Sequence, residues 1–412
     1  MSLPDEKDGY AMYSWAKQNM PALRLADEHV RRKNGERILS GTKIALCLHI
    51  SKETSVLTRY LQELGMEIEL VAANPLSTQV QIASYLRSAG INVLGMGKQS
   101  EGEYLSSISR TAHSSPQMIV DDGGELHYAY SKIGSTSCFG GTDETTTGTQ
   151  RLAALDKKGL LRYPVIPVNE ARTKHLFDNR YGTGQSSIDG LIRSTGLMLA
   201  GKVIVVSGYG WVGKGVATRA RGMGSRVIVT EVDPVLALEA HFDGYEVMNM
   251  DKASEIGDIF LTCTGQRNVI TKKYFLKMKD RAVLANCGHF DAEIDLKDLK
   301  RISSSKKQIS ENVAEYKTGG RSLILLCEGR VLNLVGAEGH PPEVMQLSFA
   351  NQLLSIFYLA LNKVELKKEK HRLLSFPKEI DDLVASFALR AFGLSIDKLS
   401  KMQLEYARSF EK

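Results

Sequence analysis

The sequence lacks three features that mark particular classes of protein. Its five cysteines are an odd, widely spaced set without a CxxC pair, which indicates neither a disulfide framework nor a cysteine metal site. No apolar run approaches the roughly 18 residues that span a bilayer, and the first residues lack the basic-then-apolar order of a secretory signal. We therefore expect reduced thiols, no membrane partner, no metal and a cytoplasmic location.

The chain also has little excess charge. Its 53 Lys and Arg residues stand against 47 Asp and Glu residues, a net charge of +6 over 412 residues. The basic residues are scattered except at 367–372, which we interpret as a solvated helix face or turn. Because no basic stripe carries interleaved aromatics, we predict no nucleic-acid partner. A net charge of this size does not exclude the binding of small anionic ligands.

Short apolar runs alternate with longer amphipathic segments, a pattern typical of βαβ units. The predicted fold is therefore α/β, with two doubly wound parallel-sheet domains and C-terminal helices. We expect a hinge near residues 179–187, where Gly182 and Gly184 interrupt the pattern, and a polar surface loop at 303–307. The predicted strands are residues 44–48, 68–72, 92–94, 118–120, 203–207, 226–230, 259–262 and 282–286, and the predicted helices are 54–64, 80–89, 212–223, 235–242 and 342–366.

The strand at 203–207 leads into the motif Gly208-Tyr-Gly210-Trp-Val-Gly213. In a dinucleotide site the first glycine permits a tight turn, the second lets backbone approach a pyrophosphate, and the third allows close helix–strand packing. Glu231 ends the next strand, about twenty residues further on. Because its carboxylate would accept hydrogen bonds from a ribose 2′-hydroxyl and repel a 2′-phosphate, we predict NAD as cofactor rather than NADP.

Polar residues follow the carboxyl ends of other predicted strands, where ligands of open α/β sheets bind. These are His49 and Asp122 in the first series, and Thr264 and His289 in the second. Each alone is explained by a structural histidine, a turn or a helix cap. The occurrence of titratable groups at two strand ends of the first series favours a shared crevice.

Two further groups of residues each allow a structural and a functional interpretation. Lys174 and Asp178 lie at i and i+4, which suits either a surface ion pair worth about 0.3–0.5 kcal/mol or a carboxylate that tunes a lysine base. A lysine base near neutral pH needs a lowered pKa. Glu144, with the threonines that follow it, precedes a predicted helical stretch, so this segment either caps a helix or contacts a ligand.

An ordered series of segments resembles the S-adenosylhomocysteine hydrolase (adenosylhomocysteinase) family. The series occurs in the family order and covers most of the chain, so it is far more specific than any one motif. Its members are Leu48-His-Ile-Ser-Lys-Glu-Thr54, Asn74-Pro-Leu-Ser-Thr-Gln79, Asp121-Asp-Gly-Gly124, Asp143-Glu-Thr-Thr-Thr-Gly148, Lys174 with Phe177-Asp-Asn179, Gly208-Tyr-Gly210 with Gly213-Lys-Gly215, Gly288-His-Phe-Asp291, and Asn333 with Gly339-His-Pro341.

The resemblance implies reversible hydrolysis of S-adenosylhomocysteine to adenosine and homocysteine. In this chemistry bound NAD⁺ oxidises the ribose 3′-hydroxyl, the C4′ proton becomes acidic, homocysteine leaves C5′, water adds, and the ketone is reduced again. S-inosylhomocysteine is an alternative substrate. An NAD-dependent dehydrogenase of the 2-hydroxy-acid type and a non-catalytic NAD- or nucleoside-binding regulator are the rival functions.

The resemblance also assigns roles to residues. Lys174, oriented by Asp178, takes the 3′-hydroxyl proton; Asp122 takes the C4′ proton; His49 assists at C5′. Glu144 holds ribose hydroxyls and Asn179 orients the lysine–cofactor region. Predicted substrate contacts are Ser51, Glu53, Thr54, His289, His340 and Met345, and predicted NAD contacts are Thr145, Thr146, Thr147, Asn179, Gly208, Gly210, Val212, Gly213, Glu231, Thr264, His289 and Asn333.

The chain departs from the family pattern at three places. Thr183 replaces a common cysteine, and Glu338 replaces a common methionine near the purine, which keeps an inosyl substrate possible. The chain also stops before a tail that reaches a neighbouring subunit in longer members, although the resemblance still implies a homotetramer. The expected divisions are a substrate domain at 1–183, an NAD domain at 184–340, helices returning to the substrate domain at 341–390, and a dimerisation segment at 391–412.

Overall fold

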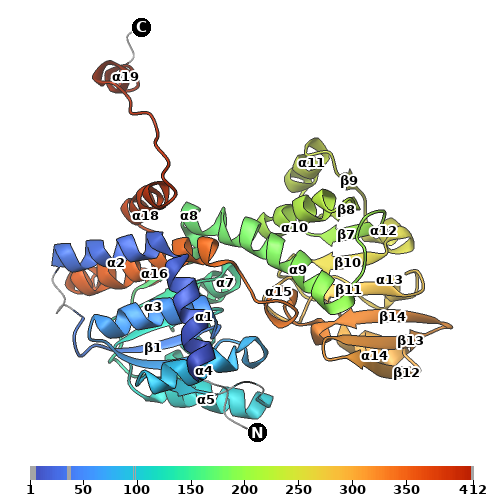
Figure 1. The fold of residues 1–412 in the computed structure, drawn as a ribbon, viewed down its shortest axis with the longest axis horizontal. Helices are drawn as coiled ribbons and strands as arrows, with labels where there is room; N and C mark the ends of the chain where they lie inside the picture. Colours follow the sequence, from blue (N-terminus) through green and yellow to red (C-terminus); the bar gives the residue numbers. More distant parts are fainter. Residues whose placement is uncertain (1–5, 35–38, 96, 98, 410–412) are drawn as a thin grey trace.

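A computed structural model describes residues 6–34, 39–95, 97 and 99–409. The first five residues, used above to argue against a secretory signal, and the last three of the expected dimerisation segment lie outside this description. Figure 1 shows two α/β bodies side by side, with helix α9 (Thr183–Thr195) running between them. The predicted fold class is confirmed.

The first body is built on a six-stranded sheet in the order β3-β2-β1-β4-β5-β6, and all its strand pairs are parallel. The order reverses between β1 and β4, a switch point where a crevice opens beyond the strand ends. Its strands are β1 (Lys43–Leu48), β2 (Glu67–Ala72), β3 (Asn92–Leu94), β4 (Met118–Asp121), β5 (Gly140–Asp143) and β6 (Val165–Pro167).

Helices cover both faces of this sheet and bury two apolar clusters against it. They include α1 (Glu6–Gln18), α2 (Pro21–Asn34), α3 (Lys52–Glu63), α4 (Val80–Ser88), α5 (Glu101–His113), α6 (Glu125–Ile133) and α7 (Thr146–Lys157), and the short α8 (Arg172–His175) follows β6. The hydroxyl of Ser51 caps α3 and that of Thr145 caps α7, each by accepting a backbone N–H. Capping therefore fixes how these two segments leave the sheet.

The second body contains an eight-stranded sheet in the order β12-β13-β14-β11-β10-β7-β8-β9. Six strands are parallel with the same reversal of order, and β12, β13 and β14 pair antiparallel at one edge. The strands are β7 (Val203–Ser207), β8 (Arg226–Thr230), β9 (Glu246–Val247), β10 (Ile259–Thr262), β11 (Ala282–Asn286), β12 (Ser305–Ser310), β13 (Val313–Thr318) and β14 (Arg321–Leu326).

The expected loop at 303–307 is wrong in part, because β12 begins at Ser305. All six side chains of β12 are exposed. This edge strand is held by backbone pairing with β13 and buries no apolar face. Its sequence therefore has no hydrophobic pattern that predicts a strand. The helices of this body are α10 (Trp211–Gly222), α11 (Pro234–Phe242), α12 (Met250–Ile256), α13 (Lys272–Phe275), α14 (Leu296–Ile302) and α15 (Leu332–Val335).

The interruption expected at Gly182 and Gly184 is also wrong, because a π-helical turn, η3 (Asp178–Gly182), runs directly into α9. A Cβ atom on Gly182 would lie 3.0 Å from the His340 ring, and one on Gly184 would lie 2.6 Å from the backbone of Gly215. These glycines therefore allow close packing and do not break the helix.

Helix α16 (Pro342–Leu361) is shorter than the helix predicted at 342–366 and is followed by a separate turn, α17 (Lys363–Leu366). Contrary to our reading of the apolar runs, α16 is long and apolar enough to cross a membrane, with a mean hydropathy of 1.4. However, 72% of that window is buried, and its apolar residues belong to the core of the first body. It is a core helix that packs on α2, α3 and β5.

The chain ends with α18 (Lys378–Ala391), which packs on α2, and α19 (Lys401–Tyr406). Figure 1 shows α19 standing away from both bodies on an extended segment that follows α18.

Candidate active site

The carboxyl ends of both sheets border one cavity of about 360 Å³. His49 and Asp122 directly follow β1 and β4 of the first sheet. Thr264 and His289 follow β10 and β11 of the second sheet by two and three residues. Strand-end groups from two separate sheets therefore face the same space, as the sequence predicted for each sheet alone.

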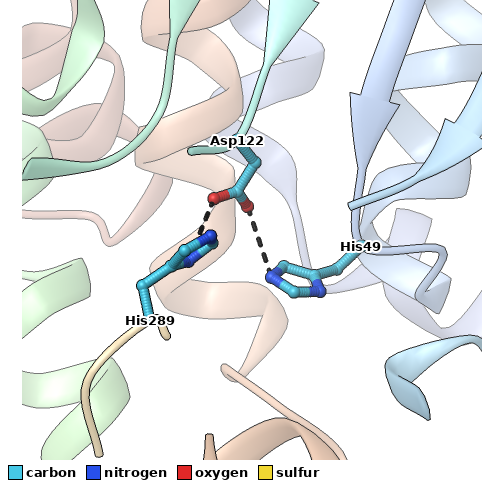
Figure 2. A group of neighbouring side chains, drawn as sticks. All are labelled: His49, Asp122 and His289. Atoms are coloured by element: carbon cyan, nitrogen blue, oxygen red, sulfur yellow. Dashed lines mark ion pairs between the residues drawn. The ribbon is translucent and has the colours of Figure 1, made fainter. Parts of the chain in front are cut away.

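Asp122 lies between two imidazole rings, as Figure 2 shows. Its Oδ2 is 3.6 Å from Nε2 of His49, and its Oδ1 is 3.8 Å from Nδ1 of His289. Oδ1 is buried and makes no hydrogen bond within the described chain. The adjacent Gly123 explains how His289 reaches this point, because a Cβ atom there would lie 2.5 Å from the histidine ring.

The hydrogen bond at Nδ1 of His49 decides which of its two ring nitrogens carries the proton. Ser77 donates its hydroxyl hydrogen to the Asn74 carbonyl oxygen over 2.8 Å, so its Oγ accepts from Nδ1 of His49, 2.6 Å away. Burial lowers the pKa of His49 to about 4, with partial compensation from Asp122. Neutral His49 therefore presents an unprotonated Nε2 toward the carboxylate. We did not single out Ser77 from the sequence, although it lies in a matched segment.

Lys174 and Asp178 form a buried ion pair rather than a surface pair, with Nζ 3.4 Å from Oδ1. Asn179 accepts a hydrogen bond from the same Nζ at 2.8 Å, and Glu144 Oε1 is 3.9 Å away. Burial lowers the pKa of Lys174, but Asp178 and Glu144 outweigh it, so the net shift is upward. The lowered lysine pKa expected for a base is therefore not a property of this arrangement.

Glu144 is held by two residues of α16. The Ser348 hydroxyl lies 2.6 Å from Oε1, and the Gln352 amide donates to Oε2. Ser348 also lies 3.0 Å from Oδ2 of Asp178. Burial raises the pKa of Glu144 to about 7, although Lys174 opposes the shift. Ser348 and Gln352 could not be predicted as site residues, because the sequence of a long apolar helix does not indicate which distant side chain its few polar residues contact.

The other end of the cavity contains His340, whose Nδ1 lies 3.2 Å from Oδ1 of Asp178. Thr183 lies 3.1 Å from its Nε2, so the residue that replaces a cysteine in the family pattern contacts this histidine. Glu53 is buried, and burial raises its pKa although Lys52 opposes the shift. Glu338 is paired with Lys52 at 3.1 Å and with Arg193 at 3.4 Å, so two cations compensate its charge although Lys52 is shared with Glu53.

Most predicted site residues line this one cavity. Gly208, Gly213 and Glu231 are the exceptions. The carboxylate of Glu231 instead accepts hydrogen bonds from the backbone N–H groups of Tyr209, Val232 and Asp233. Their contacts with NAD, like the other assigned roles, stay predictions. The predicted residues that line it are His49, Ser51, Glu53, Thr54, Asp122, Glu144, Thr145, Thr146, Thr147, Lys174, Asp178, Asn179, Gly210, Val212, Thr264, His289, Asn333, His340 and Met345.

Comparison with known proteins gives the same family as the ordered motifs. Residues 6–136 match the S-adenosyl-L-homocysteine hydrolase family, and residues 179–339 match the NAD-binding domain of that family. The adenosylhomocysteinase of Sulfurisphaera tokodaii is 48% identical over 98% of this chain and 96% of its own length. That of Aquifex aeolicus is 46% identical over 100% and 98%. An S-inosyl-L-homocysteine hydrolase of Methanocaldococcus jannaschii is 45% identical over 98% and 97%.

The chain belongs to the S-adenosyl-L-homocysteine hydrolase family. It is a hydrolase with NAD as its cofactor, and both predictions are confirmed. The match extends over almost the whole length of these relatives.

The loop after β7 fits the dinucleotide that the family uses. Gly208 has a φ of +97°, and a Cβ atom on Gly213 would lie 1.9 Å from the Gly208 carbonyl oxygen. A Cβ atom on Gly210 would meet no described atom within 4 Å, which leaves space beside the start of α10 for a pyrophosphate. Oδ1 of Asn333 is buried without a hydrogen-bond partner in the described chain, and thus is free to accept one from a cofactor amide.

Proposed function

We propose that this chain catalyses the reversible hydrolysis of S-adenosyl-L-homocysteine to adenosine and homocysteine. The observation that carries the proposal is the convergence of two proton-transfer groups, Lys174 with Asp178 and His49 with Asp122, in the cavity that the dinucleotide loop borders. Bound NAD supplies reversible oxidation of the sugar at C3′, which makes the neighbouring C4′ hydrogen acidic. A simple dehydrogenase would need only one of the two groups.

We assign the 3′-hydroxyl of the ribose to the Lys174 group. Asn179 and Asp178 direct Nζ of Lys174 from two sides, and Glu144 offers a further polar contact for the ribose. Because the pKa of Lys174 is raised here, its service as a base requires additional positive charge close to Nζ.

We assign C4′ and C5′ to the group in Figure 2. Asp122 removes the C4′ proton, which its buried Oδ1 can accept since no hydrogen bond within the described chain occupies it. The proton that Asp122 takes from C4′ passes to Nε2 of His49, 3.6 Å away, which is unprotonated before each turnover because the pKa of His49 is about 4. His49 gives this proton to the leaving sulfur, and its free Nε2 then accepts one from the attacking water, which returns through Asp122 to C4′. His289 contacts Asp122 from the opposite side.

We propose adenine as the base of the substrate, which makes the substrate an adenosyl thioether. The 6-amino group of adenine donates hydrogen bonds, and an ionised Glu53 accepts them; Glu338 adds no uncompensated charge because Lys52 pairs with it. The second candidate is an inosyl group, favoured by the Methanocaldococcus jannaschii relative and by the raised pKa of Glu53, since a protonated carboxyl donates to a 6-oxo group.

Thiol release separates these candidates. NAD-loaded protein is incubated with the adenosyl and the inosyl thioether in turn, and free homocysteine is titrated. We expect faster release from the adenosyl substrate. Folded, loaded protein that releases no thiol from either substrate contradicts the hydrolase assignment, and faster release from the inosyl substrate replaces the first candidate with the second.

We also propose a homotetramer built from dimers, in a reducing cytoplasmic compartment. All five cysteines are free, which supports such a compartment. Four large apolar residues are exposed between α18 and α19, and Met402 is exposed on α19, a pattern that favours burial against another copy. The four are Phe392, Leu394, Ile396 and Leu399. Sedimentation of the full chain and of a chain ending at residue 391 tests this, and an unchanged size after truncation contradicts a role for the segment.

A further inference from the structure

Ser348 occupies an unusual position between two buried carboxyl groups. Its Oγ lies 2.6 Å from Oε1 of Glu144 and 3.0 Å from Oδ2 of Asp178, and all three side chains are at least nine-tenths buried. A serine hydroxyl has a single hydrogen, so it donates to only one of the two carboxyl groups. If both were ionised, the other contact would bring two oxygen lone pairs together without a proton in a dry environment, which is strongly unfavourable.

The geometry therefore requires one additional proton in this group of three side chains. Asp178 is not its carrier, because Nζ of Lys174 lies 3.4 Å and Nδ1 of His340 3.2 Å from its Oδ1. Lys174 and His340 hold the pKa of Asp178 well below its usual range, although burial opposes them. Asp178 therefore stays ionised, and it accepts the hydrogen of Ser348.

Glu144 is the remaining carrier. Its Oε2 accepts a hydrogen bond from the Gln352 amide, which leaves Oε1 as the oxygen that faces Ser348. The amide is oriented for this contact, because its carbonyl oxygen accepts a hydrogen bond from Thr142 at 2.5 Å. Burial and Asp178 raise the pKa of Glu144 to about 7, whereas a hydrogen bond donated by Ser348 to Glu144 would lower this pKa.

We propose that Ser348 is a positioning residue that keeps Glu144 protonated by accepting its hydrogen bond while donating its own hydrogen to Asp178. Glu144 Oε1 thus donates to Ser348 Oγ, and Ser348 Oγ donates to Asp178 Oδ2. Charge then balances in the buried site, with one ammonium at Lys174 and one carboxylate at Asp178. Neutral Glu144 can donate to the cavity when its proton is released from Ser348. The inference deepens the proposed ribose role of Glu144 and rests on it.

The charged groups that act on Glu144 come from α8 and η3. Lys174 on α8 opposes the proton on Glu144, whereas Asp178 on η3 favours it. Burial favours the neutral acid as well. Burial also raises the pKa of Asp143, the preceding residue in β5. On the described face of α16, Ser348 and Gln352 contribute polar and uncharged groups. Ser348 is thus the one contact whose direction of donation depends on the proton.

Difference infrared spectroscopy of the NAD-loaded protein, recorded without substrate over a pH series, tests the proposal. The C=O stretch of a protonated carboxylic acid reports the proton, and its loss in Glu144→Gln assigns it. We expect a midpoint near pH 7 in the unaltered chain. In Ser348→Ala the acid loses the acceptor of its hydrogen bond, so the midpoint falls by about one unit.

Ser355→Ala is the matched control, because Ser355 lies two turns along the same buried helix and its Oγ has no hydrogen-bond partner in the described chain. Its midpoint should equal that of the unaltered chain. A missing acid band below pH 7 overturns the proposal. A midpoint in Ser348→Ala that stays or rises also overturns it, because Ser348 would then not accept from the acid. Since no turnover is measured, failure here is distinct from failure of the hydrolase assignment.

Discussion

Substitution of Asp122 by asparagine separates proton abstraction from the other steps assigned to this cavity. The change preserves the size of the side chain and removes its charge and its capacity to accept a proton. Both imidazoles lie beyond hydrogen-bond distance, at 3.6 and 3.8 Å. Since Oδ1 also makes no hydrogen bond in the described structure, the free energy of unfolding should fall by no more than about 1 kcal/mol.

A positioned general base contributes about 10²- to 10⁴-fold to a rate. Asp122→Asn should therefore slow thiol release and the exchange of C4′ hydrogen with deuterated water by a factor in this range. Oxidation at C3′, followed by cofactor absorbance after substrate addition, should persist because Lys174 and Asp178 are untouched. This split between two partial reactions is the signature of a C4′ base.

The control for this experiment is Asp382→Asn, which makes the same change at an exposed carboxylate paired with Lys378. Its rates should match those of the unaltered protein. Exchange at C4′ that stays within threefold of the unaltered rate in Asp122→Asn would refute the assignment. The base would then have to be sought elsewhere in the cavity, and His49 and His289, the two imidazoles beside Asp122, would be tested first.

Two further substitutions test the cofactor loop and the buried ion pair. Gly210→Ala should fold normally, because its Cβ atom meets only open space, and should bind NAD at least tenfold more weakly in equilibrium dialysis, because that space is the one proposed for the pyrophosphate. Gly213→Ala should lower the midpoint of thermal unfolding, because its Cβ atom would lie 1.9 Å from a backbone oxygen. Lys174→Met leaves the buried carboxylate of Asp178 without its ammonium partner and should lower the free energy of unfolding in urea at neutral pH by about 3–5 kcal/mol. The lowered pKa of Asp178 stabilises the fold above its unfolded pKa of about 4, and this contribution is lost as the pH falls through the folded pKa, so the deficit should shrink at acid pH; an equal deficit at both would contradict the pairing.

The accuracy of the sequence prediction differs between strands for a physical reason. The strands predicted in the second body, such as 203–207 and 282–286, match β7 and β11 residue for residue, because buried parallel strands are continuous apolar runs. Strand β5, with the sequence Gly-Gly-Thr-Asp, was not predicted. Its glycines are required by tertiary packing: a Cβ atom on Gly141 would lie 2.6 Å from the His127 ring. That neighbour is invisible in a local pattern.

The same distinction applies to the site. His49 and Asp122 could be predicted because they end strands, and parallel strand ends meet at one edge of a sheet wherever the chain goes in between. Ser348 and Gln352 obey no such rule, since they lie 204 and 208 residues from Glu144 and contact it only because α16 returns to the first sheet. The upward shift of the Lys174 pKa has the same origin, because it depends on Glu144 as well as on its sequence neighbour Asp178. Strand topology therefore identifies the groups that reach a ligand, whereas the protonation of those groups is decided by a helix whose placement only the folded chain reveals.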